Sequence, residues 1–192
     1  MTKIKICGLR RMEDVVWSNE LLPDYVGFVF AKSKRQVTAA QAKAMIDALN
    51  PSIQTVGVFV NADADTLKSV QETCGLDILQ LHGEESVPFC EALKPRVWKA
   101  FRVKSQDDFA EANRYKAESY LLDGFDLAAH GGTGTAFDWR MAKEYQFNAP
   151  LVIAGGIDET NVNQVIDILS PMAVDVSSAV ETDGYKDAEK VA

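Results

Sequence analysis

Eight short apolar runs recur along the whole chain, each bounded by turn residues and separated from the next by a more polar stretch. They read IKICG, YVGFVF, TVGVFV, DILQLHG, VWKAF, SYLLDG, PLVIAGG and AVDVSS, and they begin near residues 4, 25, 54, 77, 97, 119, 150 and 173. Short runs rich in Val, Ile and Phe between turn residues predict buried strands.

The stretches between these runs carry helical spacing. In TAAQAKAMIDAL and DETNVNQVIDIL the apolar residues fall three and four positions apart, as on one face of a helix. Strands and helices that alternate over 192 residues predict a single domain, residues 1–192, folded as an α/β protein of the (β/α)8 TIM barrel type. An open doubly wound sheet is the alternative. The barrel is favoured because the units are short and similar, and because no GxGxxG follows the first run.

The last unit of this pattern is incomplete. After the eighth run ends at Ser178, only the loop AVETDGY and the short segment KDAEKVA follow, so the last helix is predicted to be short or missing. A barrel normally covers the outer face of each strand with a helix. We therefore expect self-association or a weakened fold at the seam between the first and eighth strands. The outward side chains expected to be poorly screened there are Ile4, Ile6, Val174 and Val176.

Side chains alternate between the two faces of a strand, so each run divides into an apolar face toward the helices and a mixed face toward the barrel interior. Burying polar groups is costly unless they pair or act. Lys5 and Asp175 lie on neighbouring strands once the barrel closes, so we expect them to form a structural ion pair. The other residues stand at carboxyl strand ends, where barrel enzymes place their chemistry. The polar residues collected in the lumen are Lys5, Cys7, Gln80, His82, Asp123, Asp175 and Ser177.

Cys7 ends the first predicted strand and Asp123 ends the sixth, so the two face each other across the mouth of a closed barrel. A thiol and a carboxyl group on opposite walls suit a general base and a general acid. A thiol with its ordinary pKa of about 8.5 needs nearby positive charge to act as a base, and Lys5 is the candidate. An inert buried cysteine is the alternative for Cys7. Asp126 in the following loop competes with Asp123, and either aspartate could instead cap a loop or a helix.

Two late segments suit a phosphate group. IAGGIDETN places Gly155 and Gly156 between a strand and a helix start, and DVSSAVE places Ser177 and Ser178 at the end of the eighth strand. Exposed N–H groups at such positions attract anions, and barrels often bind phosphate after strands seven and eight. A plain turn is the alternative for the glycine pair.

Arg35 in AKSKRQ could clamp a substrate carboxylate with two parallel hydrogen bonds. Alternatively, it belongs with Lys32 and Lys34 to a solvated charge run. The glycine-rich stretch GFDLAAHGGTGTAFDW is either a lid over the site or a simple connection.

Three lumen residues are assigned to substrate binding, namely Gln80, His82 and Asp175. For His82 a satisfied interior histidine is the alternative. Cys74 and Cys90 fall in helical stretches and are expected to be packing residues.

Composition limits the partners. A net charge of −8 with no basic run beyond KSKR argues against nucleic acid or an anionic membrane as partner. No apolar stretch approaches the ~20 residues of a membrane span, and MTKIKIC lacks the features of a secretory signal. Three widely spaced cysteines fit a reducing compartment and do not fit the usual zinc spacings. We therefore expect a cytoplasmic protein without a metal site.

An ordered set of motifs covers nearly the whole chain: KICGL, VGFVF, KSKR, VGVFVN, LQLHG, LLDG, GGTGTAFDW, IAGGI and VDVSSAVE. On these motifs the chain resembles the phosphoribosylanthranilate isomerase family of tryptophan biosynthesis. The resemblance implies that Cys7 is the general base, that Asp123 is the general acid and that Arg35 binds the anthranilate carboxylate. It also implies a phosphate site formed by Gly155, Gly156, Ser177 and Ser178.

The reaction implied by the resemblance is an Amadori rearrangement of a small phosphorylated anion, N-(5-phosphoribosyl)anthranilate. It requires no metal or organic cofactor because a protonated imine is itself the electron sink. The chain departs from the family pattern at Ala179, where the family commonly has glycine, and in its last helix, which runs further in the family. Three other functions are the alternatives. One is a different phosphosugar barrel enzyme, such as an epimerase or an aminoaldose isomerase; the others are a thiol redox protein and a non-catalytic barrel.

Overall fold

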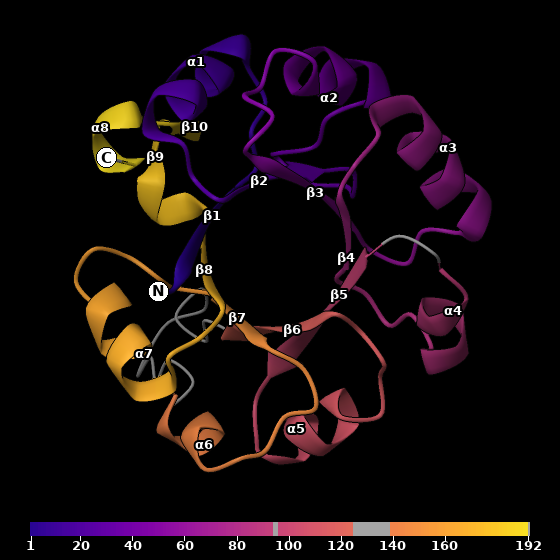
Figure 1. Ribbon diagram of the computed structural model, residues 1–192, viewed down its shortest axis with the longest axis vertical. Coiled ribbons are helices and arrows are strands. Elements are labelled where there is room, and N and C mark those ends of the chain that lie inside the picture. Colours follow the sequence, from indigo (N-terminus) through magenta and orange to yellow (C-terminus); the bar gives the residue numbers. More distant parts are fainter. Residues whose placement is uncertain (94–95, 125–138, 192) are drawn as a thin grey trace.

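Eight parallel strands close into a barrel in the computed structural model, which describes residues 1–93, 96–124 and 139–191 (Figure 1). The strands pair in chain order, and β1 completes the barrel by pairing with β8. Each apolar run forms one of these strands, so the predicted (β/α)8 TIM barrel is confirmed. The strand bounds are Lys3–Cys7 (β1), Tyr25–Val29 (β2), Gln54–Phe59 (β3), Ile78–Leu81 (β4), Arg96–Val103 (β5), Ser119–Gly124 (β6), Leu151–Ala154 (β7) and Ala173–Val176 (β8).

Helices form a ring around the outside of the barrel (Figure 1). Local capping explains where two of them begin: the side chain of Asp63 accepts a hydrogen bond from the Thr66 N–H at 2.7 Å ahead of α3, and Thr38 and Gln41 cap the start of α2 reciprocally. Gly75 ends α3 at φ 66°, a left-handed conformation that glycine adopts without strain. The helix bounds are Met12–Leu21 (α1), Ala39–Ile46 (α2), Ala64–Cys74 (α3), Val87–Ala92 (α4), Asp107–Ala112 (α5), Arg140–Lys143 (α6), Val162–Leu169 (α7) and Ala188–Val191 (α8).

The lower part of the lumen is filled with apolar side chains. Tyr25, Ile78 and Ala173 are each the first residue of their strand, and all three belong to one buried cluster inside the barrel. In the same cluster the Tyr25 and Trp98 rings meet edge to face at 5.0 Å, a favourable aromatic geometry. This packed floor leaves the polar lumen residues at the carboxyl ends of the strands.

The seam between β1 and β8 is better covered than the sequence suggested. Ile6 and Val174 are 2% and 3% exposed, and Val176 is partly buried, so the expectation that these side chains are poorly screened is wrong. Val180 shares a core cluster with Ile6 because the chain after β8 folds back over the barrel. Ile4 remains open at 48% exposed, as expected.

The segment that covers the seam contains a hairpin where the sequence pattern predicts a loop. After a short 3-10 turn, Ser178–Val180 (η2), strand Glu181–Thr182 (β9) pairs antiparallel with Tyr185–Lys186 (β10). Asp183 and Gly184 connect them with φ of 50° and 77°, the pair of left-handed residues that a two-residue Asp-Gly turn supplies. The last helix, α8, has 4 residues and is as short as predicted.

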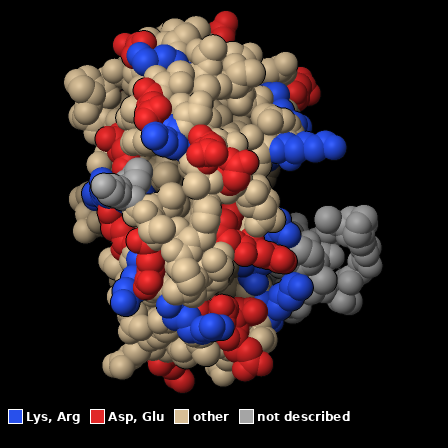
Figure 2. Space-filling model, turned by 90° about the vertical axis from the view of Figure 1, so that its right-hand side faces the viewer, with Lys and Arg blue, Asp and Glu red and all other residues tan. Residues whose placement is uncertain are grey.

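Acidic and basic side chains are interspersed over the face of the molecule shown in Figure 2. Within the described parts of the chain, none of the helices is long and apolar enough to cross a membrane.

Candidate active site at the carboxyl ends of the strands

A cavity of about 430 Å³ opens at the carboxyl ends of the barrel strands. The structure brings all the predicted site residues together around it. They are Cys7, Arg35, Gln80, His82, Asp123, Gly155, Gly156, Asp175, Ser177 and Ser178. The same cavity is also lined by Lys32 and Arg102.

Cys7 occupies one wall of the cavity as the last residue of β1 and is 9% exposed. Glycine is required beside it: a Cβ at Gly27, its partner on β2, would lie 2.8 Å from the Cys7 Sγ. Burial raises the pKa of the Cys7 thiol, while the positive charges of Lys5 and Lys186 lower it. Lys5 therefore acts in the expected direction, but burial outweighs it and the net shift is upward.

Lys5 and Asp175 form the predicted ion pair below Cys7. The Lys5 Nζ lies 2.6 Å from the Asp175 Oδ2, and the Lys5 side chain is fully buried. Burial alone would lower the pKa of Lys5, but Asp175 and Cys7 outweigh burial and raise it. The second oxygen of Asp175, Oδ1, is buried without a hydrogen-bond partner among the described residues. Because Asp175 lines the cavity, Oδ1 is a hydrogen-bond acceptor at the cavity that the ion pair does not use.

Asp123 lies near the end of β6 and is held by a row of two side chains, Gln80 on β4 and His82 directly after that strand. The Gln80 Nε2 lies 3.1 Å from the His82 Nδ1, and the His82 Nε2 lies 3.1 Å from the Asp123 Oδ2. Because an amide Nε2 can only donate, Nδ1 of His82 accepts and Nε2 carries the proton that is donated to Asp123. A Cβ at Gly155 would lie 2.4 Å from the Asp123 Oδ1. Gly155, at φ 79°, therefore lets the β7 loop pack directly against this carboxylate.

The loops after β7 and β8 form the adjoining wall of the cavity. Gly156 has φ 68° and open space where a Cβ would stand, so an incoming group can approach its backbone closely. Ser177 donates from its Oγ to the backbone oxygen of Cys7 at 2.9 Å, which ties the β8 loop to the end of β1.

Three charged residues of this region were not singled out from the sequence: Arg102 on the cavity wall, Glu181 on β9 and Lys186 on β10. Arg35 donates to both oxygens of Glu181, from Nε at 2.6 Å and from Nη2 at 2.9 Å. Lys186 donates to the Glu181 Oε1 at 2.9 Å and to the Ser177 oxygen and Oγ at 2.8 and 3.2 Å. The Asp-Gly pair between them is a recognised hairpin signal and would have placed both residues beside each other.

The other residues named from the sequence are either buried away from the cavity or lie outside the described residues. Cys74 and Cys90 are buried at 3% exposed each, as expected for packing residues. Asp126 and most of the glycine-rich stretch fall within residues 125–138, outside the described residues. Over residues 1–93, 96–124 and 139–191 no three His, Cys, Asp or Glu side chains group as a metal ion would require.

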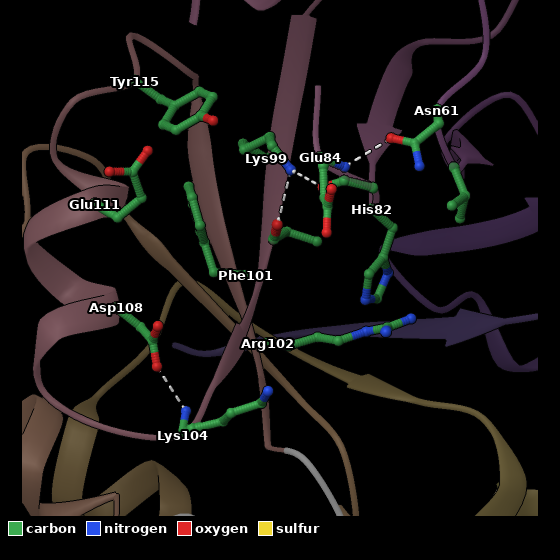
Figure 3. Close-up of a pocket in the computed structure, with 13 residues that line it drawn as sticks. Asn61, His82, Glu84, Lys99, Phe101, Arg102, Lys104, Asp108, Glu111 and Tyr115 are labelled. Carbon is green, nitrogen blue, oxygen red and sulfur yellow. Dashed lines mark hydrogen bonds between the residues drawn. The ribbon is translucent and has the colours of Figure 1, made fainter. Parts of the chain in front are cut away.

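A second cavity, of about 520 Å³, adjoins the first and shares Val60, His82 and Arg102 with it (Figure 3). Its wall includes Lys99, whose ammonium group lies 3.1 Å from the Glu85 carboxylate and donates to three backbone oxygens. That cation is therefore satisfied by the protein itself. The thiol and the carboxyl group that suit catalysis lie on the first cavity.

Protonation of Glu181 is expected to remove a stabilising contribution at low pH. Burial raises the pKa of Glu181, but the hydrogen bonds and charges of Arg35 and Lys186 prevail and lower it from 4.5 to about 2. A depressed pKa in the folded state gives stability that is complete above pH 4.5 and is lost as the pH falls through about 2. The difference in free energy of unfolding between wild type and Glu181→Gln should be constant from pH 7 to about 5 and shrink below that. Urea unfolding of both proteins across this pH range measures the difference. A difference that does not vary with pH would contradict the lowered pKa of Glu181.

A closed eight-stranded barrel with a thiol and a hydrogen-bonded carboxyl group on one cavity is the arrangement of a TIM-barrel enzyme that uses general acid and base catalysis. The family profile described as N-(5'phosphoribosyl)anthranilate (PRA) isomerase matches residues 4–192. The chain belongs to this family.

Individual relatives match this chain over nearly their full length. The N-(5'-phosphoribosyl)anthranilate isomerase of Thermoanaerobacter sp. (strain X514) is 47% identical over 192 residues, which cover 100% of this chain and 95% of that protein. A structure of monomers generated from the dimeric isomerase of Thermotoga maritima is 37% identical with a TM-score of 0.86, covering 100% of this chain and 95% of that one. A family structure in complex with reduced 1-(o-carboxyphenylamino)-1-deoxyribulose 5-phosphate is 36% identical with a TM-score of 0.87 and the same coverage.

Proposed function

We propose that Cys7 and Asp123 carry out the reaction of this family, the Amadori rearrangement of N-(5'-phosphoribosyl)anthranilate to 1-(2-carboxyphenylamino)-1-deoxyribulose 5-phosphate in tryptophan biosynthesis. The observation that carries this proposal is that both residues, at the ends of β1 and β6, line one cavity. The bound ligand of the 36% identical relative is the reduced form of this product, which supports a small phosphorylated anion as substrate.

The first step is ring opening. Asp123 in its protonated form donates to the furanose ring oxygen; the bond from C1' to that oxygen breaks, and the anthranilate nitrogen supplies the electron pair that forms the imine. Because the His82 Nε2 lies 3.1 Å from Oδ2 of Asp123, the carboxyl group is held in one orientation while Oδ1 remains for the substrate. A general acid at this step contributes about 10²- to 10⁴-fold to the rate.

The second step is proton abstraction. Cys7 as thiolate removes the proton from C2', and the electron pair of that bond forms a C1'–C2' double bond while the protonated imine becomes an amine. The resulting enolamine then tautomerises to the ketone. The protonated imine accepts the electrons, so the step draws on no metal or organic cofactor. Lys5 and Lys186, which lower the pKa of Cys7 against the effect of burial, favour the thiolate this step requires.

The remaining lining residues bind the substrate. Arg35 binds the anthranilate carboxylate, since a guanidinium group can hold a carboxylate by two hydrogen bonds. Asp175, with its unpartnered Oδ1, accepts from the ribose hydroxyls, and Gln80 and His82 line the same side. The phosphate binds between the loops after β7 and β8, at Gly155, Gly156, Ser177 and Ser178, as barrel phosphate sites do.

The function is tested by mixing the protein with N-(5'-phosphoribosyl)anthranilate and following the fluorescence of the substrate. Fluorescence should fall at a rate proportional to protein concentration and faster than in buffer alone. A rate equal to that of buffer would reject the isomerase assignment and leave another phosphosugar barrel enzyme, a redox protein or a non-catalytic barrel. The assay separates the isomerase from these alternatives because none of them consumes this substrate.

The partners follow from the same site. The protein takes a small phosphorylated anion and binds neither nucleic acid nor a membrane surface, since a net charge of −8 repels polyanions. We propose that the protein acts in the cytoplasm, because a reducing compartment suits its three free cysteines.

Self-association through the β1–β8 seam is also expected. Ile4 is 48% exposed there, and the Thermotoga maritima relative is described as dimeric. Sedimentation velocity over a concentration series should give a mass that rises with concentration, and Ile4→Lys should lower it. Circular dichroism checks that the variant is folded. A monomer at every concentration would contradict this interface.

A further inference from the structure

The guanidinium group of Arg35 is held along one of its two hydrogen-bonding edges. Glu181 occupies the edge formed by Nε and Nη2, at 2.6 and 2.9 Å. Among the described residues nothing accepts a hydrogen bond from Nη1 of Arg35. A carboxylate bound bidentately needs only two parallel N–H groups, so the edge formed by Nη1 and the second N–H of Nη2 is free to bind one.

The aliphatic stem of Arg35 is held as well. A Cβ at Gly8 would lie 2.6 Å from the Arg35 Cδ, and Gly8 has φ 94°. Glycine at this position therefore allows the arginine stem to cross directly over the end of β1, next to Cys7. The stem and one edge of the guanidinium group together fix the direction in which the free edge points.

Glu181 is itself anchored from the other side. Lys186, whose side chain is 1% exposed, lies 2.9 Å from Glu181 and donates also to Ser177. The β9–β10 hairpin that carries both is clamped at its turn, because the Tyr185 ring lies 4.4 Å from the guanidinium carbons of both Arg10 and Arg11. Glu181 cannot swing out of the site without breaking these contacts.

The charges of this cluster also fit an anionic ligand. Glu181, whose side chain is 6% exposed, carries one negative charge against the positive charges of Arg35, Lys186 and the more distant Lys34, whose Nζ lies 3.8 Å from Oε2 of Glu181. The cluster therefore keeps a net positive charge, which suits an anionic ligand. Removing the Glu181 charge leaves neighbouring cations that repel each other, and the Arg35 side chain, at 20% exposed, is freer to move away than that of Lys186, at 1%.

We infer that Glu181 is a positioning residue that holds Arg35 by one edge and presents the other edge to the aryl carboxylate of the substrate. Lys186 keeps Glu181 in place. The inference rests on the proposed role of Arg35 in binding that carboxylate. It assigns to the hairpin after β8 a part in substrate selection, because a substrate lacking the carboxylate gains nothing from an oriented Arg35.

The test compares Glu181→Gln with wild type in the fluorescence assay. Glutamine keeps the size of the side chain but loses the charge and one acceptor. KM should rise by about tenfold or more, since charge-assisted bidentate contacts are strong, while kcat changes by less than about threefold. Glu181→Asp, which keeps the charge at a shorter reach, should give a KM between the two. The matched control is Glu72→Gln, whose ion pair with Lys68 is exposed on α3, and it should leave KM and kcat unchanged.

A second pair of variants shows whether Glu181 acts through Arg35. Arg35→Ala should raise KM at least as much as Glu181→Gln, and the double variant should be no worse than Arg35→Ala alone. If Glu181→Gln leaves KM unchanged, or raises it by the same factor in the Arg35→Ala background, the positioning role is wrong. If Arg35→Ala itself leaves KM unchanged, the proposed carboxylate site fails first. Thermal melting of each variant checks folding, and near-normal kcat in Glu181→Asp shows that the site is assembled.

Discussion

Replacing Cys7 by alanine is expected to lower kcat by about 10²- to 10⁴-fold, the usual contribution of a general base. Binding of the reduced product should persist, because the residues assigned to the carboxylate and the phosphate remain. Cys7→Ser should lose nearly as much, although serine fills the space beside Gly27, because a hydroxyl is far harder to deprotonate than a thiol. Steady-state kinetics and calorimetric titration with the reduced product measure the two effects.

The matched control for Cys7 is Cys74→Ala. Cys74 is a buried cysteine at the end of α3 whose Sγ approaches the backbone oxygen of Ala39 at 3.4 Å, and it does not line the cavity. This variant loses packing but should keep kcat. Turnover close to wild type in Cys7→Ala, or an equal loss in Cys74→Ala, would show that the thiol is not the base.

Replacing Asp123 by asparagine is expected to cause a loss of similar size, about 10²- to 10⁴-fold in kcat. The asparagine side-chain oxygen can still accept from the Nε2 of His82, so the row from Gln80 to position 123 is preserved while the transferable proton is lost. Kinetics with N-(5'-phosphoribosyl)anthranilate and titration with the reduced product should again separate a chemical defect from a binding defect.

Asp126→Asn is the comparison for this second prediction, because Asp126 is the neighbouring carboxylate that competed for the acid role in the sequence. It should retain turnover. A severe loss in Asp126→Asn together with near-normal turnover in Asp123→Asn would exchange the two roles and refute the assignment.

The strands and the lumen were predictable because both depend on local pattern. A buried strand requires a continuous apolar run, and side-chain alternation then decides which residues face inward. For this reason the ion pair of Lys5 with Asp175, and the gathering of Cys7 and Asp123 on one cavity, followed from the sequence alone.

Three features of the site were not predictable from the sequence because they depend on tertiary packing. The pairing of Arg35 with Glu181 joins residues 146 positions apart, and it depends on how the hairpin after β8 folds back, which no local pattern encodes. The pKa of Cys7 depends on opposing effects, burial against Lys5 and Lys186, and their balance requires the actual depth of the thiol. The close approach of Gly155 to Asp123 is likewise a matter of tertiary packing, although the glycine pair itself stands out in the sequence.

The position of the β9–β10 hairpin bears on the order in which the protein matures during translation. Cys7 and Arg35 leave the ribosome early, whereas their partners Ser177 and Glu181, and Lys186, which contacts both partners, follow all eight barrel strands in the chain. Closure of the barrel also awaits β8, because Lys5 and Asp175 are 170 positions apart and such non-local contacts form late. The nascent chain therefore remains incapable of turnover until β8 has emerged and the barrel has closed, so activity reports folding of the whole barrel.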